Sequence, residues 1–280
     1  MNTSKILVYR RFNVDHLSAL ENQSIFILRE AYKKFDKMAM LWSMGKDSTV
    51  LLWLARKAFF GNIPFECAHI DTTFKFQEMY DYREKYAKEW NLNLFVGVNE
   101  EAKARGINYD NNDPVTVCHE MKTVALQQFI EKKKWNGLVV GIRRDEDGTR
   151  AKEKFFSPRN IDFEWDYKDQ PPELWNQFQS DYPKDMHVRI HPLLEWTETD
   201  VWEYVKRENI PVVDLYYAKD GKRYRTLGCQ PITKPVESEA DTIDKIIEEL
   251  KTTKTSERAG REQDHSQRYA MQKLRAKGYM

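Results

Sequence analysis

The residues from Ser43 to Thr49, with the sequence SMGKDST, have the side chains and the backbone freedom to hold a phosphate group. Ser43 and Gly45 allow a tight turn whose backbone N–H groups point outward, and a following helix adds the positive end of its dipole. Lys46 supplies a mobile positive charge, and Ser48 and Thr49 can donate hydroxyl hydrogen bonds. We call residues 43–49 the phosphate loop. It lacks the G-x-x-x-x-G-K spacing of a Walker A motif, and an ordinary strand–helix turn is the alternative interpretation.

The phosphate loop lies between an apolar segment and a segment with helical spacing of its apolar residues. This alternation continues along the chain, with strand-like segments at 38–42, 65–70, 94–98 and 137–142 and helical segments at 48–60, 74–90 and 116–134. Such a pattern is typical of a parallel sheet covered on both faces. We therefore predict an α/β fold with a Rossmann-like parallel sheet flanked by helices. Ligands of such sheets bind beyond the carboxyl ends of the strands, where the phosphate loop would lie.

Further segments complete this layout. An amphipathic helix is predicted over 14–35, and the segment 187–194 is strand-like. A helix should then begin after Thr197, with Asp200 three residues on in a capping-box arrangement. In contrast, residues 151–186 show no helical or strand periodicity, and a loop of that length is usually functional or mobile.

The composition divides the chain into two parts. Residues 1–215 carry the alternating strands and helices and are assigned to a nucleotide-binding α/β domain. Residues 216–280 are polar and highly charged, so we interpret them as a C-terminal extension with one helix within 238–253. The residues from 255 onward are expected to be partly disordered until a partner binds.

Charge and cysteine usage argue against several classes of protein. The 45 Lys and Arg nearly cancel the 44 Asp and Glu, which argues against nucleic-acid or anionic-membrane binding. Cys67, Cys118 and Cys229 include no C-x-x-C pair, so neither a thiolate zinc site nor an iron–sulfur cluster is expected. There is no run of about 18 apolar residues and no cleavable leader, so we expect a soluble, cytoplasmic protein.

The phosphate loop resembles the signature of the PP-loop ATP pyrophosphatase superfamily, whose members bind ATP there and cleave it between the α- and β-phosphates. Further blocks are similar to the small catalytic subunits of heterodimeric sulfate adenylyltransferases: HIDTTFKFQEMYDYRE at 69–84, GIRRDEDGTRAKE at 141–153, RIHPLLEWTETDVWEY at 189–204, RYRTLGCQPITKPVES at 223–238 and TSERAGR at 255–261. The resemblance covers nearly the whole chain. It implies an adenine nucleotide α-hydrolase-like fold and the reaction of ATP with sulfate to give adenosine 5′-phosphosulfate and pyrophosphate.

The resemblance also implies roles for particular residues. ATP would contact Ser43, Met44, Gly45, Lys46, Asp47, Ser48, Thr49, Asp71, Thr72 and Gly141. The implied catalytic residues are Lys46, Arg143 and Arg144, and the implied sulfate ligands are Arg143, Arg144, Arg150 and Lys152. Planar guanidinium groups suit tetrahedral oxyanions. The alternative is that these cations pair with the carboxylates between them on a solvated face. Sulfate is fully ionised near neutral pH, so the reaction needs no general base.

Magnesium is expected to arrive with the ATP phosphates, and Asp71 could hold it or a ribose hydroxyl. Capping of the helix at 74–90 is the alternative role of Asp71. The family usually has glycine after Asp-Thr, where this chain has Thr73, which raises doubt about an unusual backbone angle there. His69 and Cys229 are interpreted as buried structural residues, with a reactive thiol as the alternative for Cys229.

The expected partner is a separate GTPase, the large subunit of the family's heterodimer, because forming a sulfate–phosphate anhydride is uphill. This chain has no G-x-x-x-x-G-K-S/T motif of its own, and we expect its charged C-terminal region to dock the GTPase. Relative to many family members, the segment before Arg223 is shortened. Two other functions stay open. One is a phosphoadenosine- or adenosine-phosphosulfate reductase, although no cysteine follows Cys229. The other is a PP-loop adenylating enzyme with a different acceptor.

Overall fold

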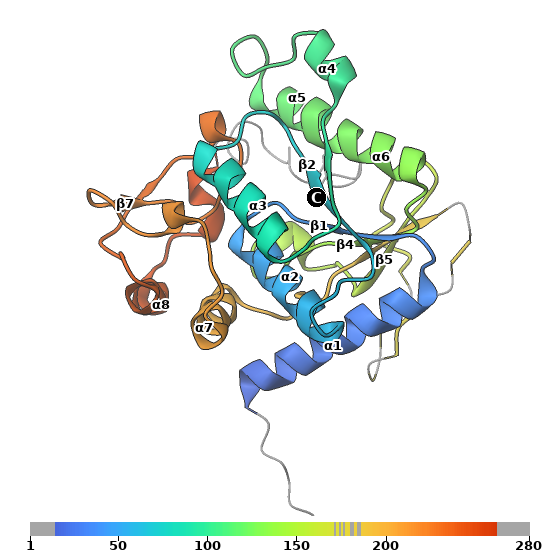
Figure 1. The fold of residues 1–280 in the computed structure, drawn as a ribbon, viewed down its shortest axis with the longest axis horizontal. Helices are drawn as coiled ribbons and strands as arrows, with labels where there is room; N and C mark the ends of the chain where they lie inside the picture. The colour runs from blue at the N-terminus through green and yellow to red at the C-terminus, as the bar shows by residue number, and fades with distance from the viewer. Residues whose placement is uncertain are drawn as a thin grey trace, which may run out of the picture.

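A six-stranded sheet forms the centre of the computed structural model, which describes residues 15–170, 172, 173, 175, 177–179, 182, 183 and 186–261 (Figure 1). The strands are β1 (Met38–Leu41), β2 (Glu66–Ile70), β3 (Leu94–Gly97), β4 (Gly137–Val139), β5 (Phe156–Arg159) and β6 (His187–Ile190). Their order is β3-β2-β1-β4-β6-β5. All neighbours run parallel except β5, which pairs antiparallel with β6 at one edge. The predicted parallel sheet is confirmed.

Helices cover both faces of the sheet. They are α1 (His16–Lys34), α2 (Lys46–Ala58), α3 (Gln77–Glu89), α4 (Glu100–Ala104), α5 (Pro114–Cys118), α6 (Ala125–Lys133), α7 (Glu198–Glu208) and α8 (Ile243–Thr252). In Figure 1, α1 and α2 lie on one side of the sheet and α5 and α6 on the other. As expected for a strand covered on both faces, β1 is buried at every position.

Several short elements join the helices and strands. β7 (Lys222–Arg223) and β8 (Val236–Glu237) form a two-stranded antiparallel sheet. A π-helical turn, η1 (His119–Val124), connects α5 to α6, so the helix predicted over 116–134 contains one wide turn. The 3₁₀ turns are η2 (Gly148–Arg150), η3 (Asp214–Tyr216), η4 (Gln230–Ile232) and η5 (Glu257–Gly260).

Aromatic side chains fill the core next to β1. Trp42 follows this strand, is 1% exposed, and has its ring centroid 6.0 Å from that of Tyr82 and 6.3 Å from that of Trp90. Towards α6, the ring centroid of Phe95 in β3 lies 5.0 Å from that of Phe129. Dense packing of this kind fixes the ends of the strands and therefore the position of the phosphate loop.

One strand differs from the sequence prediction, because β5 lies inside the stretch 151–186 for which no strand is expected. This strand has only four residues and includes Pro158, so it is too short to show a periodic pattern. Proline is tolerated because β5 lies at the edge of the sheet, where one side of the strand has no ladder partner. The interpretation of this stretch as lacking strand structure is therefore wrong at these residues.

The predicted start of α7 is confirmed. Thr197 and Asp200 form a capping box, in which each side chain accepts a hydrogen bond from the backbone N–H of the other residue, at 3.1 and 2.8 Å. The helix expected within 238–253 is α8, which packs against α7. The domain division at residue 215 stays a prediction, and the expectation for the tail beyond residue 261 falls outside the described residues.

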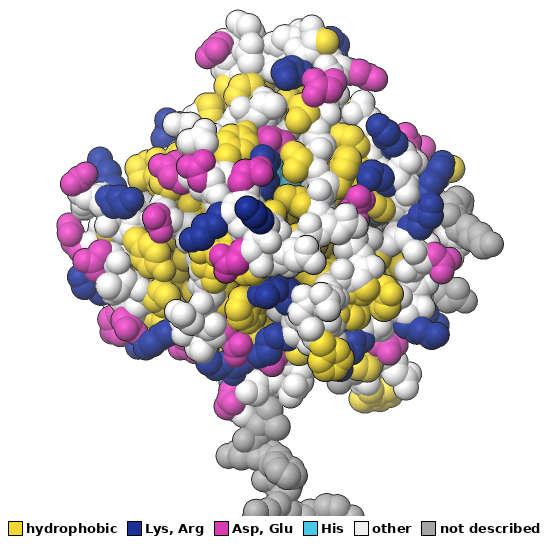
Figure 2. Space-filling view, viewed as in Figure 1, with side chains coloured by type: hydrophobic (Ala, Val, Ile, Leu, Met, Phe, Trp, Pro, Cys, Tyr) yellow, Lys and Arg dark blue, Asp and Glu magenta, His cyan; other side chains and the backbone are white. Residues whose placement is uncertain are grey.

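Acidic and basic side chains are interspersed on the molecular face shown in Figure 2, with apolar side chains between them. No helix among the described residues combines the length and the apolar character needed to cross a bilayer.

Candidate active site

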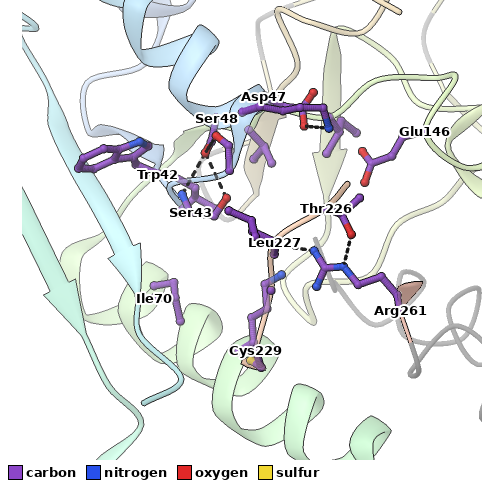
Figure 3. Close-up of a pocket in the computed structure, with 18 of the residues that line it drawn as sticks. Trp42, Ser43, Asp47, Ser48, Ile70, Glu146, Thr226, Leu227, Cys229 and Arg261 are labelled. Carbon is purple, nitrogen blue, oxygen red and sulfur yellow. Dashed lines mark hydrogen bonds and ion pairs between the residues drawn. The ribbon is translucent and has the colours of Figure 1, made fainter. Parts of the chain in front are cut away.

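A pocket opens at the carboxyl ends of β1, β2 and β4. β2 and β3 lie on one side of β1, whereas β4, β6 and β5 lie on the other side. Open parallel sheets bind ligands at such a switch in strand order. The walls of the pocket come from the phosphate loop, from residues after β2, from η1 and from the C-terminal residues 226–229 and 257–261 (Figure 3). Residues that the sequence assigns to the C-terminal extension therefore form part of the same pocket.

The hydroxyl groups of the phosphate loop fix its shape. Gly45 is the N-cap of α2, and the Ser48 hydroxyl donates a hydrogen bond to the Gly45 carbonyl oxygen at 3.0 Å. The Ser43 N–H donates to the Ser48 hydroxyl at 3.2 Å. Between them, Met44 has a φ of 60°, a left-handed angle that is uncommon for residues other than glycine. The predicted strand–helix turn is present, with the positive end of α2 at the pocket, but its left-handed residue is Met44 and not Gly45, whose φ is −66°.

Gly141 permits a close approach between the end of β4 and the start of α2. A Cβ atom at this position would lie 3.2 Å from the backbone N and Cα of Ser48 and 3.3 Å from the carbonyl carbon of Asp47. Backbone atoms cannot rotate away as a side chain can, so a larger residue here would displace the phosphate loop from the sheet.

Two buried cations converge on the carboxylate of Glu257. Lys46 and Arg143 each form an ion pair with it, and the three side chains are 1%, 0% and 6% exposed. Asp47 also pairs with both cations, at 3.3 Å from Lys46 Nζ. Burial would raise the pKa of Glu257, but the charges of Arg143 and Lys46 outweigh it and lower the pKa. Glu257 therefore stays ionised between the two cations.

A second buried cluster lies beside the first. Glu146 forms ion pairs with Arg150 and with Arg258, the latter at 2.9 Å. Burial alone would raise the pKa of Glu146, but the two arginines lower it. Arg150, which the sequence suggests as a sulfate ligand, lines the pocket with its charge already matched by this carboxylate.

The structure brings most of the predicted ATP-contacting residues to one place. The pocket is lined by Ser43, Gly45, Lys46, Asp47, Ser48, Thr72 and Gly141. Met44 and Thr49 are buried and do not line the pocket, and the Thr49 hydroxyl accepts a hydrogen bond from Trp42 Nε1 at 3.3 Å. Arg143 is also buried and is linked to the pocket through Glu257. Their contacts with ATP stay predictions.

Asp71 is not among the residues that line the pocket. Its carboxylate accepts hydrogen bonds from the Thr73 N–H at 2.8 Å and the Tyr80 hydroxyl at 3.0 Å, and it pairs with Arg83 at 3.2 Å. The alternative that Asp71 caps the following helix is wrong, because the N-cap of α3 is Phe76. Thr73 has a φ of 64°, so the left-handed backbone angle occurs at this position although the residue is not glycine, and the doubt raised by the sequence does not hold.

Arg144 and Lys152 lie outside the pocket. Arg144 pairs with Glu195 and donates a hydrogen bond to the Glu153 carbonyl oxygen at 3.2 Å. Lys152 lies 4.8 Å from the centroid of the Tyr167 ring. For these two residues the positions match the alternative interpretation, a solvated charged face, better than contact with a substrate.

Cys229 and His69 are buried, as the sequence suggests. Cys229 lies at the pocket wall, with its sulfur 3.1 Å from the Thr72 hydroxyl. Burial would raise the pKa of its thiol, but Lys75 and the hydrogen bond with Thr72 outweigh it and lower the pKa. His69 has its pKa lowered to about 3, chiefly by burial, so it is neutral near pH 7.

Sequence reasoning missed several residues of the pocket. The Tyr216 hydroxyl accepts a hydrogen bond from the Lys46 N–H at 2.9 Å, and Glu257 and Arg261 reach the pocket from the block at 255–261. Three of the seven residues in that block are charged, and such a density of charge can indicate a binding site. It has no helical or strand period, however, so the sequence does not show where these charges point.

Together, the fold and the pocket define a class of protein. The parallel sheet, the phosphate loop after its first strand and the pocket at the switch in strand order are those of PP-loop nucleotide-binding proteins. A family model for the phosphoadenosine phosphosulfate reductase domain matches residues 37–235.

Curated relatives narrow the class further. Sulfate adenylyltransferase subunit 2 of Geotalea daltonii is 43% identical over 294 aligned positions, which cover 94% of this chain and 98% of that protein. The protein of the same name from Bacteroides fragilis is 42% identical and covers 96% of this chain and 98% of its own length. The chain belongs to the sulfate adenylyltransferase subunit 2 family, which is a family of nucleotidyltransferases by its name. The resemblance noted in the sequence is thereby confirmed.

Solved structures support the fold alone, because their sequences are distant. Phosphoadenylyl-sulfate reductase from Candida auris, in a phosphate complex, is 17% identical with a TM-score of 0.52, over 82% of this chain and 98% of that chain. FMN adenylyltransferase from Candida glabrata, in complex with ATP, is 19% identical with a TM-score of 0.53, over 78% of this chain and 63% of that chain.

Proposed function

We propose that the chain transfers the adenylyl group of ATP to sulfate, giving adenosine 5′-phosphosulfate and pyrophosphate. Family membership over nearly the whole chain supports this function. The structural observation that carries it is the pair of buried cations, Lys46 and Arg143, that meet on one carboxylate beside the phosphate loop. Cations arranged in this way bind an anion, and the triphosphate of ATP is the anion that the loop suits.

The pocket offers separate places for the base and for the phosphates. Leu41, Ile70, Val140 and Ile142 give it an apolar wall at the ends of the strands, which suits an adenine ring. The phosphate loop and Lys46 offer N–H groups and a positive charge for the β- and γ-phosphates. With ATP placed in this way, the phosphates and the carboxylate of Glu257 compete for the same two cations.

The proposed reaction is an in-line displacement at the α-phosphorus. A sulfate oxygen forms the new bond to phosphorus while the bond from phosphorus to the α,β-bridging oxygen breaks. The electron pair of that bond leaves with pyrophosphate. The charge that develops on pyrophosphate would be stabilised by Lys46 and by the N–H groups of the phosphate loop. Because sulfate is already ionised, no side chain has to remove a proton.

We propose that magnesium binds mainly through the ATP phosphates. Among the described residues, no group of three or more His, Cys, Asp or Glu side chains could hold a metal ion. Asp71 is engaged by Thr73, Tyr80 and Arg83. The ion usually keeps several waters and binds through one or two carboxylates plus substrate phosphates. Asp47 is the carboxylate of the phosphate loop that would meet it.

We also propose a cytoplasmic protein that works with a GTPase subunit, because the anhydride product is high in energy. Docking of that subunit through the C-terminal region is testable by truncation after Arg261, which keeps Glu257 and Arg261 in the pocket. Loss of co-purification with the GTPase subunit, at unchanged thermal stability of the chain, is expected. Retained co-purification would place the docking surface elsewhere.

The experiment that tests the function is exchange of labelled pyrophosphate into ATP, with Mg²⁺, in the presence and absence of sulfate and of the GTPase subunit with GTP. Sulfate-dependent exchange is the expected result. Exchange that does not depend on sulfate but requires another acceptor would favour an adenylating enzyme with that acceptor. No exchange, combined with thiol-dependent release of sulfite from adenosine 5′-phosphosulfate, would favour the reductase alternative, for which Cys229 at the pocket wall is the available thiol.

A further inference from the structure

Three cations line the pocket beside residues 226–229: Lys75, Lys122 and Arg261, which we call the acceptor cluster. They lie close enough to act on one another, because Lys75 and Arg261 both disfavour the charged form of Lys122. Among the described residues, no carboxylate forms an ion pair with Lys75 or Arg261. The setting of Lys75 and Arg261 differs from that of Lys46 and Arg143, whose charges are matched by Glu257 and Asp47.

The guanidinium of Arg261 is held at the pocket by neutral partners. It donates hydrogen bonds to the Thr226 hydroxyl at 2.8 Å and to the Leu227 carbonyl oxygen (Figure 3). A Cβ atom at Gly228 would lie 1.6 Å from one of its terminal nitrogens, so only glycine lets the guanidinium lie across the backbone at this point. These partners orient Arg261 without neutralising it.

Irregular backbone also carries the two lysines to the pocket. Lys122 lies on η1, the π-helical turn between α5 and α6, and such turns are frequent at functional sites. Lys75 lies two residues after Thr73, whose left-handed φ of 64° turns the chain after β2. Such conformations cost free energy and persist where the surrounding structure imposes them. The two lysines are thus carried to the pocket by segments with irregular backbone, and Arg261 depends on Gly228 for its position. Three separate segments of the chain bring one cation each to the same pocket.

The chemistry of the reaction requires an anion site away from the phosphate loop. In an in-line displacement the attacking oxygen approaches the α-phosphorus from the side opposite the leaving group. Pyrophosphate leaves on the phosphate loop, so the acceptor must enter from a part of the pocket built by other segments. The residues of the acceptor cluster come from the segment after β2, from η1 and from the position after η5, and none of them belongs to the phosphate loop.

We infer that the sulfate binds at the acceptor cluster, with its oxygens held by Lys75, Lys122 and Arg261 while ATP occupies the phosphate loop. The inference rests on the proposed function and moves the acceptor from Arg144 and Lys152, which lie outside the pocket. Sulfate carries two charges and has no proton to donate, so a site made of donors satisfies it fully. A partly buried site strengthens this attraction relative to water.

The test compares the apparent KM for sulfate with that for ATP in the exchange assay, using the chain with its GTPase subunit. The variants are Lys75→Met and Lys122→Met, each of which removes one positive charge and keeps much of the side-chain volume. Lys132→Met, on an exposed position of α6 outside the pocket, is the matched control. Far-UV circular dichroism and thermal unfolding verify that each variant folds.

We expect each cluster variant to raise the KM for sulfate at least tenfold, with the KM for ATP within twofold of wild type and the control unchanged. If the KM for sulfate stays within twofold in both variants, the cluster does not bind the acceptor. A KM for ATP that rises in parallel would assign the lysines to the nucleotide instead. If a variant does not fold, Lys75→Gln and Lys122→Gln take its place. Wild-type chain without sulfate-dependent exchange would overturn the proposed function itself, a result distinct from the others.

Discussion

Replacing Glu257 by glutamine should destabilise the ligand-free chain and at the same time tighten its binding of ATP. The substitution keeps the shape of the side chain and removes the negative charge that Lys46 and Arg143 share. In the folded chain, both cations lose a partner that they cannot replace with water, because their side chains are 1% and 0% exposed. ATP phosphates, by contrast, no longer have to displace a carboxylate.

The expected loss of unfolding free energy depends on the ion pairs that Lys46 and Arg143 retain in the variant. Breaking a buried ion pair by removing one partner costs roughly 3–5 kcal/mol. Here Lys46 retains Asp47 at 3.3 Å, and Arg143 retains Asp145 at 3.0 Å. We therefore expect a loss near the lower end, about 3 kcal/mol of unfolding free energy at pH 7. For ATP, removal of the competing carboxylate should lower the Kd at least tenfold.

Urea unfolding and calorimetric titration with an ATP analogue that cannot be cleaved between the α- and β-phosphates would measure the two quantities. Glu248→Gln is the matched control, because Glu248 is 72% exposed and, within the part of the chain that the structure describes, forms an ion pair with Lys251 alone. The unfolding free energy of this variant should differ from that of wild type by less than about 0.5 kcal/mol. A folded Glu257→Gln variant with unchanged or weaker affinity for the analogue would refute the competition between Glu257 and the phosphates.

The difference in unfolding free energy between wild type and Glu257→Gln should depend on pH. Folding lowers the pKa of Glu257 from the ordinary value of 4.5, because the two cations outweigh the cost of burial. The carboxylate therefore adds stability above about pH 4.5, and this stability is lost as the pH falls through the lower folded-state pKa. The difference in unfolding free energy between wild type and Glu257→Gln should narrow in acid and be constant from pH 6 to 8.

Three other predictions concern the loop and the acceptor cluster. Lys46→Ala should lower kcat of the exchange reaction by about a hundredfold or more with the fold retained, since it removes a charge from the leaving group; normal turnover would remove Lys46 from the mechanism. Gly141→Ala should raise the KM for ATP, because its Cβ would meet the Ser48 backbone at 3.2 Å, and an unchanged KM would mean that the loop can yield. Burial, Lys75 and Arg261 lower the pKa of Lys122 to about 7, although Cys118 and Cys229 oppose them. The KM for sulfate should therefore rise above pH 7 as Lys122 loses its proton, and Lys122→Arg should make the KM for sulfate less dependent on pH.

The sheet could be predicted from the sequence because its strands are short apolar runs between helices of clear amphipathic period. β1 is buried at all four positions, and a strand of that kind has no polar face to obscure its pattern. The edge strand β5 could not be predicted, since its register depends on pairing with β6, which lies far along the chain. Pairing of that kind is a tertiary effect that overrides local propensity.

The phosphate loop could be predicted because its chemistry is local, with the glycine, the lysine and the hydroxyls adjacent in sequence. The acceptor cluster and Glu257 could not, because the segments that carry them are distant in sequence and irregular in backbone. Arg144 illustrates the limit, since its neighbour Arg143 turns inward to Glu257 while Arg144 pairs with Glu195. Adjacent arginines in a loop have no period from which their directions could be read.

Glu257 and Arg261 are four residues apart on one short segment, η5 and the residue after it, and they reach different parts of the pocket. A phosphate that displaces Glu257 from Lys46 and Arg143 would shift the segment and with it the guanidinium at the acceptor cluster. ATP and sulfate would then be thermodynamically linked, and each must change the affinity of the other by the same factor. Occupancy of either anion site would then be communicated to the other through η5 and the residue after it.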